Sequence, residues 1–448
     1  MIDRSRRRRL AALTGAAAAA VVAVAAQLAG AAPASAAVPP PLPPSTRFAV
    51  EPPSDGAASQ IADLVKQHRL KDALLVTKEV ATPQAAWFTG GSAAEVRADV
   101  QRTVRRAALQ KAVPTLVVYN APGRDCSQYS SGGAPSDVAY RSWIDGVAAG
   151  IGTSRAIVIV EPDGLANLPS DCPSVYPDPG TYPDPAPGTA TAGRIADVKY
   201  AGSAIQRADP TALVYLDAGH SAWHGLSETD GTSIVQRLQD AGVDDVRGFS
   251  LNTSNYQWTP NLSQYGTWIS DCLAYTSKVE PGDYASCGDQ YWSGGPSNGF
   301  QGVALDPAKQ WSVTATDATA NTAGITSRYA ALLGDAKATA GFVLDTSRNG
   351  TGPWAPTAGT YTGDPQTWCN PPARGLGAKP KASPQPTAYP LLDAYLWVKT
   401  PGQSDGQCDR GVAGGTTDPE WDGITDPAAG VWFPQQALDL AERAVPRL

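Results

Sequence analysis

The stretch "AIVIVEPD", residues Ala156 to Asp163, joins an unbroken run of mostly β-branched apolar residues to an abrupt polar ending. Such a run predicts a strand that is buried on both faces and is followed by a loop. Six further runs have a similar form, at Ala85–Gly91, Pro114–Asn120, Ala212–Gly219, Gly248–Asn255, Gly341–Ser347 and Asp393–Thr400. The chain therefore has seven predicted strands.

The segments between these runs carry apolar residues at three- and four-residue spacing, which is typical of amphipathic helices. The clearest examples are Ser92–Lys111, Ala139–Ile151 and Ile195–Ala208. Alternating strands and helices predict an α/β fold with a parallel sheet, either as a barrel or as a doubly wound open sheet. In both architectures the ligand site lies at the carboxyl ends of the strands.

Aspartates gather at these strand ends. Asp163, Asp217 and Asp345 lie near three of them, Asp125 follows a fourth, and Asp405 follows the seventh. Asp125 alone would be read as a turn cap or as a partner of its neighbour Arg124. Several carboxylates at neighbouring strand ends are costly to bury without a purpose, so together they indicate a functional site.

The N-terminus has the order of a secretory signal peptide. Five arginines precede an alanine-rich apolar stretch that ends at "ASA", which predicts cleavage after Ala36 and export by a route left open. Residues 37–47 form a Pro-rich lead, and residues 48–448 read as one catalytic domain. Removing residues 1–36 takes five of 35 basic and one of 42 acidic residues, which leaves a net charge of −11. Nucleic acid and anionic membranes are therefore unfavourable partners.

Six cysteines lie after residue 36, an even number that favours three disulfides in an exported protein. A metal cluster is disfavoured, because no CxxC motif occurs and the histidines are His68, His220 and His224. We predict the pairs Cys126–Cys172, Cys272–Cys287 and Cys369–Cys408. No cofactor or metal is expected.

The aromatic composition helps to distinguish two functions that the aspartates at the strand ends could serve. Aspartates could bind Mg²⁺ or Ca²⁺, or they could perform acid–base chemistry on a glycosidic bond. Twelve Trp and sixteen Tyr against six Phe favour flat faces with polar edges, which suit sugar rings. Trp223 and Trp368 are the best placed of these residues.

Seven motifs occur in order between Trp87 and Phe433: "VVYNAPGRDC", "VIVEPDGLANL", "VYLDAGHSAWHG", "NTSNYQW", "VLDTSRNG", "WCN" and "WVKTPGQSDG". Together they resemble glycoside hydrolase family 6, the secreted cellulases that comprise endoglucanases and cellobiohydrolases. The resemblance implies a distorted seven-stranded α/β barrel. It also implies hydrolysis of β-1,4-glucans with inversion at the anomeric carbon.

The resemblance implies that Asp163 is the general acid, a role that its place after an apolar strand supports because desolvation keeps a carboxyl protonated. Asp125 would be the neighbouring carboxylate whose charge raises the pKa of Asp163. Ser131 would hold the attacking water and Tyr119 would lie beneath the sugar. Asp405 matches another candidate base, but an ion pair with Lys399 or Arg348 would make it a weak one.

The implied substrate-binding residues hold sugars by stacking or by hydrogen bonds. They are Trp87, Asp217, His220, Trp223, Asn255, Trp258, Trp368 and Lys399. The expected partner is a β-1,4-glucan, and the expected protein is a secreted, extracellular monomer.

Three long stretches follow strand ends and are expected on the rim of the site: Pro169–Gly193, Asn261–Thr322 and Gln407–Gly430. The third favours a roofed site of cellobiohydrolase type, whereas the Asp125 region favours an endoglucanase, so the cleavage mode stays open. Two other classes remain as alternatives. One is a secreted glucan-binding protein without turnover, and the other is a barrel hydrolase with an aspartate-bound divalent metal.

Overall fold

The computed structural model describes residues 38–172, 190–227, 232–412 and 414–448. The signal peptide predicted for residues 1–36 lies outside this part, as does most of the first long rim stretch. No helix within the described ranges is long and apolar enough to cross a membrane.

One sheet of eight strands forms the centre of residues 38–448, in the order β1-β2-β3-β4-β5-β6-β8-β7. Six neighbouring pairs are parallel, and the short β7 runs antiparallel to β8. The strands are β1 (Ala86–Phe88), β2 (Thr115–Val118), β3 (Ile157–Val160), β4 (Leu213–Asp217), β5 (Gly248–Leu251), β6 (Gly341–Asp345), β7 (Lys381–Ala382) and β8 (Leu392–Leu396). All seven predicted strands are confirmed, and β7 is the addition.

The sheet curls into a distorted barrel, as expected. Its two sides approach each other where the Ala85 N–H donates a 3.0 Å hydrogen bond to the Trp397 carbonyl. Side-chain alternation along each strand separates two cores. Val117 and Ile159 belong to the cluster inside the curl, whereas Val118 packs against the helices outside.

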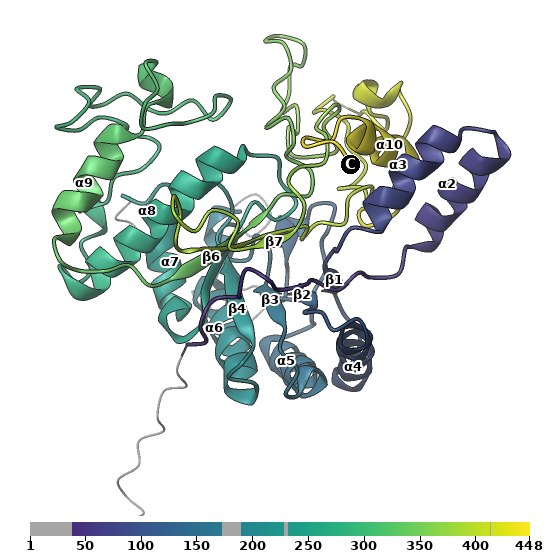
Figure 1. The fold of residues 1–448 in the computed structure, drawn as a ribbon, viewed down its shortest axis with the longest axis horizontal. Coiled ribbons are helices and arrows are strands. Elements are labelled where there is room, and N and C mark those ends of the chain that lie inside the picture. The colour runs from purple at the N-terminus through teal and green to yellow at the C-terminus, as the bar shows by residue number, and fades with distance from the viewer. Residues whose placement is uncertain (1–37, 173–189, 228–231, 413) are drawn as a thin grey trace, which may run out of the picture. The chain divides into compact units, whose positions relative to one another are not determined.

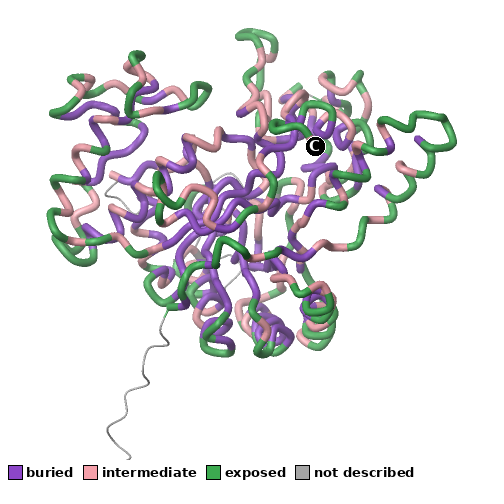
Figure 2. The backbone as a smooth tube through the Cα atoms, in the orientation of Figure 1, coloured by how far each residue is buried: buried purple, intermediate pink, exposed green. Residues whose placement is uncertain are grey.

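Helices cover the outer face of the sheet. Figure 1 shows α4, α5 and α6 side by side along it, and Figure 2 shows their buried and exposed flanks around the buried strands. The helices of the described residues are α2 (Asp55–Lys66), α3 (Leu70–Val80), α4 (Ala93–Leu109), α5 (Asp137–Ile151), α6 (Ala190–Ala208), α7 (Ile234–Asp240), α8 (Thr259–Lys278), α9 (Ala323–Leu333) and α10 (Pro434–Glu442). The three clearest predicted helices correspond to α4, α5 and α6.

The capping residues explain where these helices begin. Ser92 caps α4 by accepting a hydrogen bond from the Glu95 N–H, while the Glu95 carboxylate accepts one from the Ser92 N–H. Ser136 starts α5 in the same manner by accepting from the Ala139 N–H. The loops that lead into α4 and α5 therefore end at Ser92 and Ser136. The two helices then lead into β2 and β3.

The three predicted disulfides are present, joining Cys126 to Cys172, Cys272 to Cys287, and Cys369 to Cys408. The first ties together loops that follow β2 and β3, and the third ties together loops that follow β6 and β8. Both of these bridges therefore restrain loops at the carboxyl ends of the strands, where the structure places the candidate site.

Glu79 of α3 is a buried acid without a compensating partner. Its side chain is 0% exposed and neither carboxyl oxygen has a hydrogen-bond partner. Burial raises the pKa of Glu79 well above its ordinary value. Folding therefore favours the protonated form of Glu79, and unfolding restores its ordinary pKa.

The Glu79→Met chain is therefore expected to lose a pH dependence of stability. A raised folded-state pKa gives stability that is complete below the unfolded-state pKa, about 4.3, and is lost as the pH rises toward the folded value. Between pH 5 and 8 the free energy of unfolding should fall by about 1–3 kcal/mol more in the parent than in Glu79→Met. Denaturant unfolding measures this difference. Glu442→Met, at the exposed end of α10, is the control, and equal slopes in parent and Glu79→Met would contradict the expectation.

Candidate active site

A cavity of about 520 Å³ opens at the carboxyl ends of the parallel strands. Seven strands contribute to its lining, either directly or through the loops that follow them. Ten predicted site residues line it: Trp87, Tyr119, Asp125, Asp163, His220, Trp223, Asn255, Trp368, Lys399 and Asp405. Three others, Ser131, Asp217 and Trp258, do not.

Asp163 lies in the turn after β3, with a left-handed φ of 62°. The turn is closed by the Asn167 N–H, which donates to the Asp163 carbonyl at 2.7 Å, and it does not continue into a helix. Burial raises the pKa of Asp163 well above its ordinary value, and the nearby carboxylates of Asp217, Asp125 and Asp405 raise it further. The raised pKa favours the protonated form of this carboxyl, so Asp163 is suited to donate a proton into the cavity.

The position of Asp217 differs from the one predicted. It was expected to contact substrate, but the alternation of β4 directs it inside the barrel beneath Asp163, where it is 0% exposed. Its oxygens accept hydrogen bonds from the hydroxyls of Ser250 and Thr253 and from the backbone N–H of Asp163. Asp217 raises the pKa of Asp163 more than Asp125 does, so the effect assigned to Asp125 from the sequence is shared and mainly belongs to Asp217.

Asp125 lies in a tight loop after β2. Asp125 and Cys126 both have left-handed φ values, 63° and 46°, and Asp125 Oδ2 accepts a 2.5 Å hydrogen bond from the Ser130 N–H. Burial raises the pKa of Asp125 to about 6, partly offset by this hydrogen bond and by the charge of Arg124. The Arg124 guanidinium donates instead to the carbonyls of Thr89, Tyr119 and Ser130. The interpretation of Asp125 as a simple partner of Arg124 is therefore not supported.

Tyr119 forms part of the cavity floor. Its ring meets Trp87 edge to face, with ring centroids 5.7 Å apart, and Trp87 Nε1 donates to the Val398 carbonyl. Ser131 is exposed, and its N–H donates to the Gln128 carbonyl. Its neighbour Ser130 lines the cavity instead, so the role assigned to Ser131 stays a prediction.

Asp405 is held by two cations. Arg348 Nη1 lies 2.9 Å from Oδ2, and Lys399 Nζ lies 3.1 Å from Oδ1. Burial alone would raise the pKa of Asp405, but the charges and hydrogen bonds of its partners outweigh it and lower the pKa to about 2. Burial lowers the pKa of Lys399, and the charge of Asp405 partly offsets that shift. Asp405 therefore forms the ion pairs with Lys399 and Arg348 that would make it a weak base.

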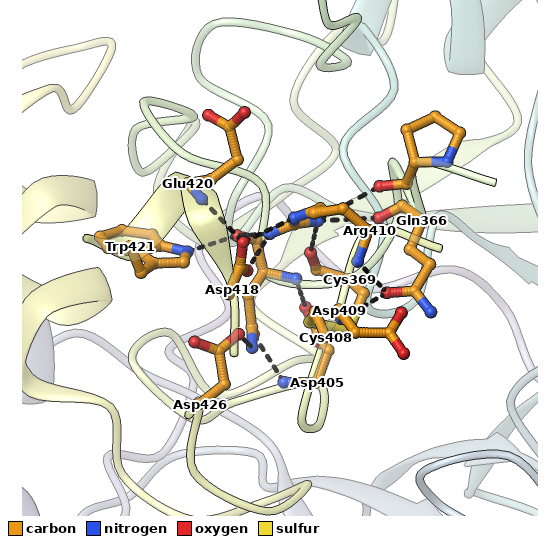
Figure 3. Close-up of polar contacts among 12 residues, drawn as sticks. Gln366, Cys369, Asp405, Cys408, Asp409, Arg410, Asp418, Glu420, Trp421 and Asp426 are labelled. Atoms are coloured by element: carbon orange, nitrogen blue, oxygen red, sulfur yellow. Dashed lines mark hydrogen bonds and ion pairs between the residues drawn. A yellow bond between two sulfur atoms is a disulfide. The ribbon is translucent and has the colours of Figure 1, made fainter. Parts of the chain in front are cut away.

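Asn370 connects Asp405 to a buried polar network, of which Figure 3 labels Arg410 and Asp418. The Asn370 N–H donates to Asp405 Oδ2, the Asp405 N–H donates to Asn370 Oδ1, and Asn370 Nδ2 donates to Asp426. Arg410, also in this network, pairs through two nitrogens with the Asp418 carboxylate. These contacts explain why Asp405 keeps one orientation.

The third long stretch, residues 407–430, does not roof the cavity. None of its described residues lines the cavity, and Arg410 instead donates to the carbonyls of Gln366, Cys369 and Asn370. Figure 3 shows Arg410 beside Gln366 and Cys369 with these contacts as dashed lines. The expectation of a roof was wrong because the stretch is drawn down onto this loop by Arg410 and the Cys369–Cys408 disulfide.

Cys408, Asp418 and Asp426 are the potential metal ligands that the described part of the chain brings together. They do not fit a cation, because Cys408 is in a disulfide and Asp418 is neutralised by Arg410. The expectation of a metal-free site stays a prediction.

Aromatic rings flank the carboxyl groups. Trp223 lies 5.3 Å from the His220 ring, and Trp368 lies 6.0 Å from the Tyr129 ring, both measured between centroids. Burial lowers the pKa of His220 to about 3, and the Ala222 N–H donates to its Nδ1. His220 is therefore neutral with its proton on Nε2, which suits hydrogen bonding to a sugar hydroxyl.

Trp258 does not line the cavity; its ring lies against Gly352, and its Nε1 donates to the carbonyl of Ala308, a lining residue. Its predicted substrate contact stays a prediction. Several lining residues were not predicted: Gln128, Ser130, Asn167, Thr253, Ser254, Tyr256, Gln257 and Trp354. Tyr256 and Gln257 lie within a quoted motif, so their position after a strand could have indicated them.

A carboxyl group with a raised pKa, near other carboxylates and flanking tryptophans at the carboxyl ends of a curled parallel sheet, is the arrangement of a glycoside hydrolase site. The chain belongs to family 6 of the glycosyl hydrolases, whose family model matches residues 44–444.

Relatives in this family include both cellulase types. The chain is 32% identical over 403 residues to endoglucanase A from Cellulomonas fimi, which covers 90% of this chain and 62% of that protein. It is 29% identical over 370 residues to a probable 1,4-beta-D-glucan cellobiohydrolase C from Aspergillus fumigatus, covering 78% of this chain and 65% of that protein. The chain thus spans less than two thirds of the length of these two relatives.

A solved structure shares the fold. The endoglucanase Cel6 from Mycobacterium tuberculosis, determined with a methyl-cellobiosyl-4-thio-cellobioside, has a TM-score of 0.58 and 31% identity. The match covers 89% of this chain and 97% of that one.

Proposed function

We propose that the protein hydrolyses β-1,4-glucosidic bonds of cellulose or a related β-glucan, with inversion at the anomeric carbon. The observation that carries this proposal is the Asp163 carboxyl, which lines the cavity and whose pKa is raised by burial and by the nearby carboxylate of Asp217. The named activities of the endoglucanase and cellobiohydrolase relatives support the same chemistry.

In the proposed reaction, Asp163 donates its proton to the leaving glycosidic oxygen as the bond from that oxygen to the anomeric carbon breaks. A water attacks the opposite face of the sugar and forms the new bond to the anomeric carbon. The proton that the water loses passes to a carboxylate, so the enzyme ends with Asp163 ionised and that carboxylate protonated. Exchange with solvent restores both groups.

Asp125 suits the role of final proton acceptor better than Asp405. Its pKa is raised to about 6, whereas the pKa of Asp405 is lowered to about 2, so Asp125 is the stronger base. Both oxygens of Asp405 are also occupied, by Lys399 and Arg348. We assign Asp405 the task of holding these cations, with Ser131 and Tyr119 placing the water and the sugar.

Export is part of the proposal. The three disulfides suit an oxidising compartment, and residues 1–36 have the sequence of a signal peptide. We therefore place the reaction outside the cell, where polymeric glucan is accessible.

The proposal is tested by incubating the purified chain with a soluble β-1,4-glucan in the presence of a chelator and measuring the release of reducing ends. Release that is unaffected by chelator is expected, because the proton transfers use carboxyl groups. A β-1,3-glucan of similar size is the matched control and should remain intact. No release from the β-1,4-glucan, or release that the chelator abolishes, would contradict the proposal.

A further inference from the structure

Trp354 lines the cavity, yet the proposed reaction gives it no task. It lies in the loop after β6 and is only partly buried. Tryptophans that serve the core of this protein, such as Trp143 and Trp268, are at most 2% exposed. Trp354 therefore presents part of its indole surface to the cavity rather than to the core.

One face of the Trp354 ring rests on a rigid support. The guanidinium carbon of Arg410 lies 5.0 Å from the ring centroid, within the range of a cation–π contact. Arg410 is 0% exposed, and it is fixed by the Asp418 carboxylate and by the Cys369 carbonyl (Figure 3). The guanidinium can neither withdraw nor rotate without losing these bonds, so the ring above it is held in place.

Neighbouring contacts hold the backbone and the edge of Trp354. Arg374 Nη1 donates to the carbonyls of Gly352 and Pro353, directly before Trp354. Tyr361 meets the ring edge at a centroid distance of 6.5 Å and its hydroxyl bonds to Glu420. A flat apolar ring fixed in this manner at a cavity wall loses little conformational entropy when a ligand packs on it.

We infer that Trp354 is a further sugar-binding platform, on which a glucose ring of a β-1,4-glucan stacks in addition to those on Trp223 and Trp368. The apolar C–H face of a pyranose matches the free indole surface, while its hydroxyls point to the sides. This inference rests on the proposed function, because it takes its ligand class from it.

The test measures binding by calorimetry in an Asp163→Asn background, with cello-oligosaccharides of two to six glucose units. Trp354→Leu keeps an apolar side chain over Arg410 but removes the flat ring. We expect it to bind about tenfold more weakly every oligosaccharide long enough to reach Trp354, and Trp354→Phe to lie within about threefold of the parent.

Trp292 provides a matched control, because it also rests on a guanidinium, that of Arg328 at 5.2 Å, but does not line the cavity. Trp292→Leu should therefore leave all affinities unchanged. Thermal unfolding of each variant shows that it is folded before binding is measured.

Unchanged affinity of folded Trp354→Leu at every length, or an equal loss in Trp292→Leu, would overturn this inference alone. Should Trp354→Leu not fold, Trp354→Phe decides, since a loss beyond tenfold despite a retained ring would show a packing role instead. Failure of the Asp163→Asn parent itself to bind any of the oligosaccharides would contradict the proposed function and the platform together.

Discussion

Replacing Asp163 with asparagine is expected to lower turnover on β-1,4-glucan by about 10²–10⁴-fold, the usual contribution of a general acid. Asparagine has nearly the same shape but cannot transfer a proton to the leaving oxygen. The backbone N–H of Asp163 donates a hydrogen bond to the Asp217 carboxylate. This contact does not use the Asp163 side chain, so the loop should keep its conformation in the variant. Initial rates of reducing-sugar release, with thermal unfolding to confirm the fold, measure the effect.

The leaving group supplies the matched control for Asp163→Asn. A cello-oligosaccharide with a dinitrophenyl leaving group needs little protonation as the bond breaks, so the variant should lose much less activity on it than on glucan. Equal losses on both substrates, or near-normal turnover on glucan, would contradict the role of Asp163 as general acid.

Asp125→Asn is expected to lower turnover by a comparable factor, about 10²–10⁴-fold, because the attacking water loses the acceptor of its proton. It should also change the pH profile. The negative charge of Asp125 raises the pKa of Asp163, so its removal lowers that pKa and moves the alkaline limb of the rate profile to lower pH. The shift is partial, since burial and Asp217 also hold the pKa of Asp163 high.

Rate profiles of kcat against pH, measured on a soluble glucan, report both effects of Asp125→Asn. Binding of a cello-oligosaccharide should survive, because the rings of Trp223 and Trp368 are untouched. Asp99→Asn removes the same charge from the exposed surface of α4 and serves as the control. Near-normal turnover with an unmoved alkaline limb would mean that Asp125 only shapes its loop.

The strands and the position of Asp163 at a strand end could be predicted from the sequence because their signals are local. Each apolar run predicts its own strand, and a polar residue directly after it must lie at the carboxyl end of a parallel sheet. Asp163 and Asp125 were found in this manner. The pair Cys126–Cys172 could be predicted because both residues follow consecutive strands, and Cys272–Cys287 because both lie within one long stretch.

Residues whose role depends on distant parts of the chain could not be predicted in the same manner. Asp217 is separated from the cavity because hydroxyls of the β5 strand and its loop, Ser250 and Thr253, hold it beneath Asp163. The described residues of the stretch 407–430 do not line the cavity, and Arg410 binds carbonyls about 40 residues earlier in the chain instead. Such contacts leave no periodicity or spacing in the sequence.

The account's central claim is that a water attacks the anomeric carbon on the face opposite the protonated leaving group, with Asp163 as acid and no covalent intermediate. Proton NMR of the first products from a cello-oligosaccharide, recorded before mutarotation, tests it most directly. Inversion predicts that the newly formed reducing end is the α-anomer. A first product in the β-anomeric form would contradict the claim, whatever the rate.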